Sequence, residues 1–237
     1  RALPASCNPF DRFVTNDPWD WVLNGLEAQN IDFMSEVVRA SHGMGLRIFS
    51  SLRLQGPKPV PLDMEMGSLY QRCPEFRCRD RLGRDIAHLS LAFPSVRNLW
   101  ISLLCETLEY GFDGVHVLFC RSHPFVLYEE PVIEKFVAEY GEDPRSCSED
   151  DPRLWKVMAS FVTQFARELY QAVESSGRER KKKIEIAYSI NSTMRSRLLA
   201  PGVDAATRPE VQGGKGRYRN AEVLTSNIMW GVDVESF

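Results

Sequence analysis

The sequence lacks the two features that would connect it with a membrane or with nucleic acid. No apolar stretch approaches the roughly 20 residues that a helix needs to cross a bilayer. Basic residues are not in excess, because the formal net charge is -3. We therefore expect no membrane span and no general affinity for nucleic acid. The one basic run, at residues 178–183, falls between a predicted helix and a predicted strand, where we interpret it as a solvated turn.

Motifs for metal, cofactor or nucleophile chemistry are also scarce. The six cysteines include no CxxC pair, and no histidine pair completes a zinc pattern, so we expect no metal. Cys73 and Cys78 are compatible with a local disulfide or with half of a metal site, whereas Cys105 and Cys120 lie in apolar elements and are predicted to be buried free thiols. Residues 213–216 are glycine-rich but do not follow a strand, so no phosphate-binding cofactor is predicted. A Gly-x-Ser-x-Gly nucleophile motif is absent as well.

The composition that remains is typical of a globular protein. The chain has 237 residues, of which 43% are hydrophobic and 26% are charged, enough for one large α/β domain or two small ones. Residues 1–25 are rich in Pro, Asn, Asp and Trp and are predicted to be irregular. Because the chain starts at Arg1 rather than at methionine, we expect a native N-terminal segment to be missing.

Helical periodicity alternates with short apolar runs along the chain. The predicted helices cover residues 31–42, 94–110, 131–140 and 152–175, and the predicted strands cover residues 46–54, 115–119 and 183–190. Residues 55–93 show no sustained periodicity and are predicted to form a long loop. The turns from helix to strand are short and rich in glycine, whereas the connections that follow the strands are long.

This alternation predicts an α/β fold with a parallel sheet. Long loops after the strands favour a (β/α)8 barrel of the TIM type. A full barrel needs roughly 250 residues. Only three or four strands can be identified here, so we expect a single barrel domain over residues 1–237 that is incomplete in this chain. The alternative is a doubly wound sheet, which usually has tighter turns after its strands.

Five segments occur in a characteristic order and spacing. They are "LRIFSSLRL" at residues 46–54, "CPEFRCRDRLGRDIAHLSLAFPSVR" at 73–97, "DGVHVLFCRSHP" at 113–124, "VLYEEPVIEKFVAEYGEDPR" at 126–145 and "WGVDVESF" at 230–237. Together they resemble an uncharacterised bacterial branch of glycosyl-hydrolase-like family 10. The resemblance implies a TIM-type barrel that acts on glycosidic bonds of polysaccharides or oligosaccharides with paired carboxylates. It also implies carbohydrate as the partner and an extracellular or periplasmic location.

The strand near residue 115 departs from the family pattern "DGIHLDFIRxP". Leu118 stands where the family often has an aspartate, whereas Asp113, His116 and Arg121 are retained. Asp113 precedes the strand and is predicted to be a turn residue, because catalytic groups in barrels lie at the C-terminal ends of strands. The chain is therefore either a hydrolase with its acids elsewhere or a non-catalytic barrel that binds carbohydrate or serves a structural role.

Four acidic residues are candidates for catalysis, since glycoside hydrolysis uses two carboxyl groups on either side of the scissile bond. Glu129 and Glu130 lie in the loop after the departing strand. Their alternative role is at the N-terminus of the following helix, which favours acidic residues. Asp233 and Glu235 follow a Trp-Gly pair near the end of the sequence, and their alternative role is as surface acids.

Candidate substrate-binding residues lie at the predicted strand ends and in the loops after them. They are Arg53, His116, Arg121, Tyr128, Tyr188 and Asn191. Because side chains alternate along a strand, His116 and Leu118 share one face, and His116 is either a structural histidine or a substrate contact. Arg53 and Arg121 would suit an anionic sugar such as a uronic acid. The two tyrosines are either sugar contacts or core residues.

Overall fold

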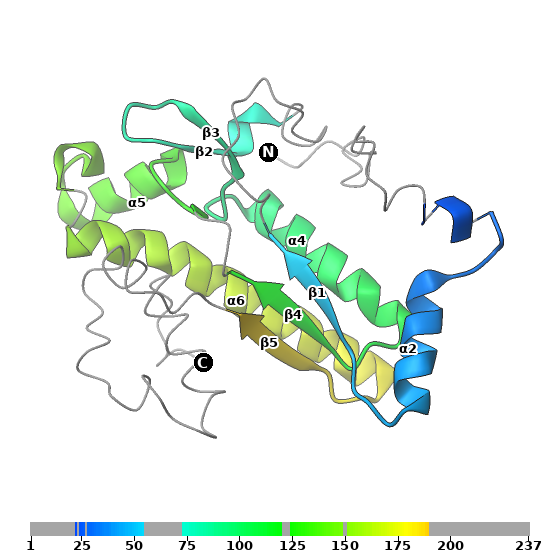
Figure 1. Cartoon of the computed structure of the whole chain (residues 1–237). Helices are drawn as coiled ribbons and strands as arrows, with labels where there is room; N and C mark the ends of the chain where they lie inside the picture. Colours follow the sequence, from blue (N-terminus) through cyan, green and yellow to red (C-terminus); the bar gives the residue numbers. More distant parts are fainter. Residues whose placement is uncertain are drawn as a thin grey trace, which may run out of the picture.

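The computed structural model describes residues 22, 24–26, 28–54, 73–119, 124–148 and 151–189. Its helices are α2 (Phe33–Gly43), α4 (Pro94–Thr107), α5 (Glu130–Tyr140) and α6 (Pro152–Arg180) (Figure 1). Its strands are β1 (Phe49–Arg53), β2 (Arg77–Arg79), β3 (Asp85–Leu89), β4 (Gly114–Leu118) and β5 (Glu185–Ser189). Short 3-10 helices lie at Pro74–Phe76, Leu108–Tyr110 and Pro144–Ser146. Among these residues, no helix is both long enough and apolar enough to span a bilayer.

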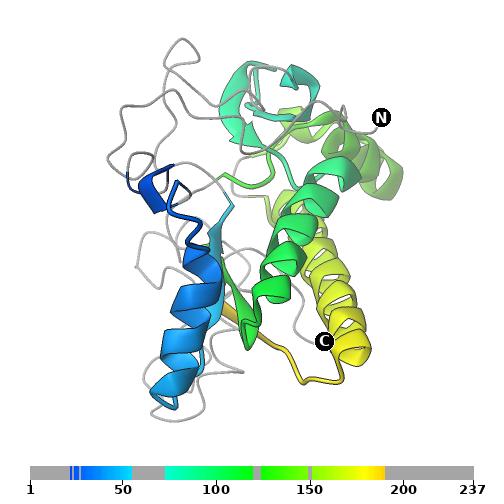
Figure 2. The same ribbon diagram turned by 90° about the vertical axis from the view of Figure 1, so that its right-hand side faces the viewer.

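Strands β1, β4 and β5 form a parallel sheet, and β2 pairs with β3 in a separate antiparallel hairpin. The parallel strands lie in the sheet in the order in which they occur along the chain. Helix α4 precedes β4, and α6 precedes β5. Figure 2 shows that α4 and α6 lie on the same side of the sheet, where α4 contacts β1 and α6 contacts β5. This arrangement is that of successive β-α-β units.

The register of the strands divides their side chains between two faces. The face covered by the helices carries Ser50, Leu52, Val115, Val117, Ile186 and Tyr188. The opposite face, which we call the open face, carries Phe49, Ser51, Arg53, Gly114, His116, Leu118, Glu185 and Ala187. Residues that lie side by side on neighbouring strands of this face form three rungs, which we number from the N-terminal end of the strands. The first rung is Phe49, Gly114 and Glu185, the second is Ser51, His116 and Ala187, and the third includes Arg53 and Leu118. Ser51 on this face is exposed, whereas Val115 and Val117 on the other are fully buried.

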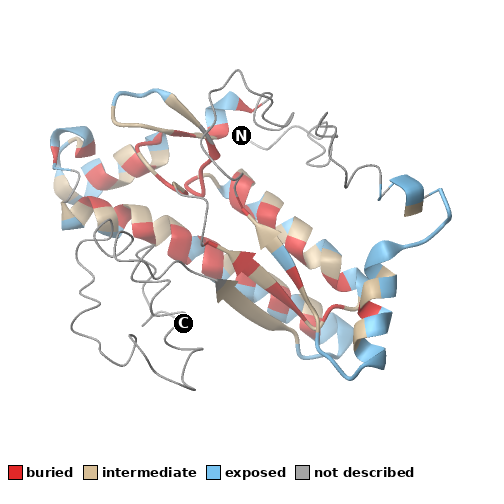
Figure 3. Ribbon diagram, in the orientation of Figure 1, coloured by how far each residue is buried: buried red, intermediate tan, exposed pale blue. Residues whose placement is uncertain are grey.

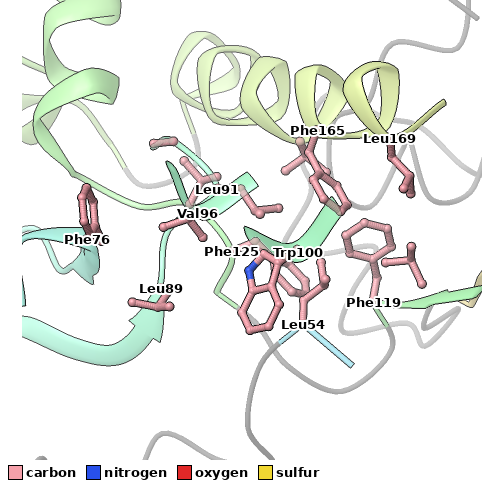
Figure 4. Close-up of a cluster of buried hydrophobic side chains, with 14 of the residues drawn as sticks. Leu54, Phe76, Leu89, Leu91, Val96, Trp100, Phe119, Phe125, Phe165 and Leu169 are labelled. Atoms are coloured by element: carbon pink, nitrogen blue, oxygen red, sulfur yellow. The ribbon is translucent and has the colours of Figure 1, made fainter. Parts of the chain in front are cut away.

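The core lies between the sheet and helices α4 and α6. Phe119 follows β4 and contacts the rings of Phe125, Phe165 and Tyr188, with centroid distances of 5.2, 6.3 and 6.0 Å. Figure 4 shows the aromatic and aliphatic side chains of this cluster together. Helix α6 supplies a stripe of buried residues at helical spacing, including Leu154, Val157, Val162, Phe165, Leu169 and Val173. Figure 3 shows that α2, in contrast, is largely exposed.

Helix α6 begins where the sequence predicts. Asp151 caps its N-terminus by accepting the backbone N–H of Arg153, and Pro152 occupies the first turn, where no N–H is needed. Arg97 joins α4 to α6, because its buried guanidinium donates to both carboxylate oxygens of Glu168 at 2.7 and 3.1 Å. The predicted helices and parallel strands are all present, with boundaries that differ by a few residues.

The prediction of a long loop over residues 55–93 is wrong for its described part. Residues 77–79 and 85–89 form the β2–β3 hairpin, in which Arg77 and Arg79 both pair with Asp85. Strand β2 has only three residues, two of them arginines, so it has too little alternation to be recognised in the sequence.

The cysteines differ from the predictions in two respects. Cys73 and Cys78 are buried free thiols, so the local disulfide is not formed. Cys105 is free, as predicted, but half-buried rather than buried. Cys120 lies outside the described residues.

The fold class is confirmed as mixed α/β with a parallel sheet. In the described part of the chain the sheet is open and has three strands, so a closed barrel is not shown. A single domain over residues 1–237 remains a prediction, because residues 1–21 and 190–237 lie outside the described residues.

Candidate functional site

The C-terminal ends of β1, β4 and β5 lie at the same edge of the sheet, because the three strands are parallel. In both barrels and doubly wound sheets, ligands bind at this edge. The candidate site is therefore the part of the open face toward the C-terminal ends of the strands. It consists of Ser51, Arg53, His116 and Leu118.

The first rung, at the N-terminal end, is closed by packing. Gly114 lies between Phe49 and Glu185, and a side chain added to it would meet the Phe49 ring at 2.3 Å and the Glu185 backbone oxygen at 2.5 Å. Arg47 reaches across this glycine, pairs with Glu185 at 2.7 Å and lies 5.9 Å from the centre of the Phe49 ring. Only glycine at position 114 permits this close approach.

The second rung holds a hydrogen-bonded serine and histidine. Ser51 Oγ and His116 Nδ1 share a hydrogen bond of 3.0 Å across β1 and β4. Ser51 is exposed and His116 is half-buried. Ala187 completes the rung with a small side chain. His116 thus belongs to the open face and has its imidazole oriented by a neighbour, which fits either of its two predicted roles.

The third rung lies at the C-terminal edge and combines a cation with an apolar side chain. Arg53 of β1 pairs in register with Leu118 of β4, and both are half-buried. Leu118 thus lies at the end of the central strand, on the open face. Of the side chains described in this rung, the one that carries a charge is that of Arg53.

Glu129 lies in the interior, between the β2–β3 hairpin and the segment before α5. Only 1% of its surface is exposed. Its carboxylate accepts the backbone N–H of Leu127 at 2.9 Å and the backbone N–H of Arg79 at 2.9 Å. Ser90 and Cys78 also form side-chain hydrogen bonds with this carboxyl group. These contacts join the hairpin to the chain that packs, through Phe125, against the end of β4.

Burial decides the protonation behaviour of this carboxyl group. Loss of solvent raises the pKa of Glu129 above its ordinary value, although the donors from Leu127, Arg79 and Ser90 oppose the shift. The pKa of the Cys78 thiol is raised well above its usual range, chiefly by burial and further by the nearby Glu129. A raised carboxyl pKa suits a general acid, but this carboxyl does not reach solvent in the structure.

Glu130 differs from its neighbour because it is exposed in the first turn of α5. Glu129 occupies the N-cap position, but its side chain makes no capping hydrogen bond and turns inward instead. Both glutamates thus lie at the start of α5, as their alternative role predicts. The side chain of Glu129, however, does not cap the helix.

The two tyrosines lie away from the open face. Tyr188 belongs to the face covered by the helices and stacks on Phe119, and burial raises its pKa well above the usual range. Tyr128 is buried beside Glu129, and its backbone N–H donates to the carbonyl of Arg79. Both positions fit the predicted core role.

Asp113 lies at the opposite end of the sheet, before β4. Its carboxylate binds Lys182 Nζ at 2.7 Å, His42 Nε2 at 2.9 Å and the backbone N–H of Ile48 at 3.0 Å. Burial opposes ionisation, but these donors outweigh it and hold the pKa of Asp113 well below its usual range. Asp113 thus ties together α2, β1 and the turn before β5, as expected for a structural residue at this end.

The remaining predicted residues, Arg121, Asn191, Asp233 and Glu235, lie outside the described residues. Within the described part of the chain, no three His, Cys, Asp or Glu side chains form a group that could hold a metal ion. Sequence reasoning missed Ser51, although alternation from Arg53 places it on the same face of its strand.

No family model matches the chain, and no curated protein matches it. Among solved structures, the chain is similar to the alpha-galactosidase from Lactobacillus brevis, with 17% sequence identity and a TM-score of 0.35. The similarity covers 67% of this chain and 18% of that enzyme, so the chain spans less than a fifth of its length. A likeness of this size establishes neither a shared fold nor a shared activity.

Proposed function

We propose that this chain binds carbohydrate on the open face, at the C-terminal edge of its parallel sheet. The observation that supports this most directly is the group of hydrogen-bonding side chains in the second and third rungs: Ser51, His116 and Arg53. A hydroxyl, an imidazole and a guanidinium offer both donors and acceptors for sugar hydroxyl groups. The resemblance of five sequence segments to a glycosyl-hydrolase-like family points to the same ligand class.

We also propose that the sheet belongs to a TIM-type barrel whose interior is the open face, and that the protein works outside the cytoplasm. The barrel is supported by the sequential strand order and by the position of α4 and α6 on one face, as barrels place their helices outside. A doubly wound sheet would reverse its strand order at one point. Among the described strands, the order does not reverse.

Binding has better support than hydrolysis in the described residues. The final three residues of β1, β4 and β5 include no carboxylate: they are 51–53, 116–118 and 187–189. Glu129 is buried and engaged by backbone donors, so we propose that it holds the hairpin in place rather than acting on substrate.

Hydrolysis is the second candidate, and the exposure of Glu130 favours it. In this proposal Glu130 is one carboxyl group, and Asp233 or Glu235 is the other. The two would have to lie about 5–10 Å apart across the glycosidic bond. Release of reducing ends from a polysaccharide panel would test the proposal. Glu130→Gln should abolish that release, and unchanged release would remove Glu130 from the mechanism.

Binding can be tested on a glycan array, followed by calorimetry on the glycans that bind. Ser51→Ala should weaken affinity about fivefold to tenfold, because one hydrogen bond to the ligand and the support of His116 are lost. Ser102→Ala, which changes an exposed serine of α4, is the matched control and should leave affinity unchanged. The proposal is wrong if no glycan binds the unaltered protein, or if both serine variants bind equally well.

A further inference from the structure

We propose that helix α2 is the surface through which two copies of this chain form a dimer, with the two helices packed antiparallel about a two-fold axis. The proposal goes beyond carbohydrate binding and does not depend on it. It rests on three properties of α2: the apolar side chains that are exposed on it, the symmetry of their spacing, and the charges beside them.

One side of α2 attaches the helix to the rest of the protein. Val38 is buried, and a carbon added to Gly111 would lie 3.5 Å from it. His42 binds the Asp113 carboxylate at 2.9 Å. Because Val38 and His42 are four residues apart, they lie on the same side of the helix, which faces the chain just before β4.

A second apolar side of α2 is exposed. Phe33, Val37, Ala40 and Met44 follow one another at spacings of four, three and four residues, which places them in one stripe. Phe33 is 45% exposed and Met44 is 68% exposed. Ala40 is also exposed, and Val37 is half-buried (Figure 3). An exposed apolar stripe along a helix is suited to packing against a partner helix.

The spacing of the stripe indicates a second copy of the same helix as that partner. Positions 33 and 44 lie equally far from its midpoint, and so do positions 37 and 40. Antiparallel packing about the midpoint therefore sets Phe33 of each copy on Met44 of the other, and Val37 of each on Ala40 of the other. Sulfur packs favourably against aromatic rings, and two-fold dimers use the same surface on both subunits in this way.

The charges beside the stripe suit the same arrangement. Glu36 and Arg39 form an exposed ion pair on one flank of α2. In the antiparallel dimer, Glu36 of each copy would lie about 3 Å along the helix axis from Arg39 of the other, because their positions differ by two residues. Opposite charges thus meet across the interface, which favours this pairing over others.

The dimer should be weak, because the surface is small. Helix α2 has 11 residues. Ile31 before the helix and Leu46 after it are exposed as well and extend the apolar surface at both ends. A contact of this size is smaller than a standard interface of about 800 Å² per partner, so we expect a Kd of about 1–100 μM.

The test is sedimentation velocity of the full chain, which should change from monomer to dimer as its concentration passes through the micromolar range. Phe33→Glu should weaken association at least about tenfold, because each dimer would then bury two unpaired carboxylates against Met44. An acidic residue suits the first turn of a helix, so this variant should fold. Leu82→Glu is the matched control. It changes a 75% exposed apolar side chain in the β2–β3 turn and should leave association unchanged.

A pair of substitutions tests the antiparallel arrangement itself. Met44→Lys alone should weaken association as Phe33→Glu does, and a basic residue suits the C-terminal end of a helix. Phe33→Glu and Met44→Lys in one chain would place opposite charges together at both contacts. This double variant should therefore associate more tightly than either single variant.

Each contrary result overturns a stated part of the inference. A monomer at every concentration would overturn the dimer and leave the stripe to a different protein. Association that is unchanged by Phe33→Glu would overturn the assignment of α2 as the interface. A double variant that associates no more tightly than the single variants would overturn the antiparallel pairing.

Discussion

The two ends of the parallel sheet each hold a carboxylate that accepts backbone N–H groups, yet the two carboxylates behave in opposite ways. Asp113 at the N-terminal end is matched by Lys182 and His42, and its pKa is lowered. Glu129, beyond the C-terminal end, is 1% exposed and has neutral donors, and its pKa is raised. The number of hydrogen bonds does not explain why the two pKa values shift in opposite directions. The difference comes from the extent of burial and from the charge of the donors.

The two ends of the sheet thus differ in role. The N-terminal end stabilises the fold, and the C-terminal end is where we propose that a ligand binds. At the N-terminal end, every carboxylate named above has a cationic partner, and the Phe49 ring packs closely against Gly114. At the C-terminal end, the nearby carboxyl is withdrawn into the protein, and Arg53 remains on the open face. The charges at the N-terminal end are thus engaged in holding the fold together, whereas the carboxyl group beyond the C-terminal end is held by neutral donors.

The largest effect should come from Glu129→Ala. The change leaves the N–H groups of Leu127 and Arg79 without their acceptor in a buried site and opens a cavity, so we expect the free energy of unfolding to fall by about 3–5 kcal/mol. Urea unfolding would measure the loss. Glu130→Ala, in the exposed neighbour, should change it by less than about 0.5 kcal/mol. Equal effects of the two substitutions would contradict the buried position of Glu129.

Gly114→Ala should have the next largest effect, at the other end of the sheet. Its new methyl group would overlap the Phe49 ring and the Glu185 backbone oxygen. We expect a loss of about 2–3 kcal/mol, because a backbone atom in a central strand cannot move aside easily. The control is Gly43→Ala, where nothing lies within 4 Å of the added carbon. That variant should keep or slightly improve stability, as measured by thermal unfolding.

Asp113→Asn should cost about 1–2 kcal/mol near pH 7, because charged partners lose part of their interaction. The folded pKa of Asp113 is depressed, so its stabilisation is fully present above the unfolded value of 3.8 and is lost as the pH falls below it. The stability difference between the two proteins should therefore shrink below about pH 4. Urea midpoints collected from pH 3 to pH 7 would show whether it does.

Glu129→Gln should have the smallest effect and the opposite pH dependence. The folded pKa of Glu129 is raised, so its stabilisation is fully present below the unfolded value of 4.5 and is lost as the pH rises through the folded pKa. The unaltered protein should thus lose stability above pH 4.5 relative to the glutamine variant. The free energy of unfolding of both proteins should be measured from pH 4 to pH 8. If the difference between them does not change with pH, Glu129 does not titrate as its burial requires.

Local signals were enough to predict most elements of the fold. Pro152 and Asp151 indicate the start of α6, and Gly141, with a φ of 75°, ends α5. The short, largely apolar run from Val115 to Phe119 predicts β4. The hairpin was missed because β2 is short and charged, and its pairing depends on residues outside its own segment.

The candidate site was only partly predictable. Alternation along β4 places His116 and Leu118 on one face, but the hydrogen bond between His116 and Ser51 joins residues 65 positions apart. Glu129 and Glu130 carry the same local signals, and one is buried while the other is exposed. The hairpin that buries Glu129 comes from a segment 50 residues away, at Arg79.

The amino-acid sequence by itself determined the α/β class, the positions of the four helices and three parallel strands named above, and the absence of an acid at position 118. These properties depend on residue types and on their spacing within a short segment of the chain. The tertiary structure alone decided which face of the sheet is open, which glutamate is withdrawn and where Arg53 lies relative to Ser51 and His116. Register and burial arise from contacts between distant segments, and periodicity within one segment does not encode them.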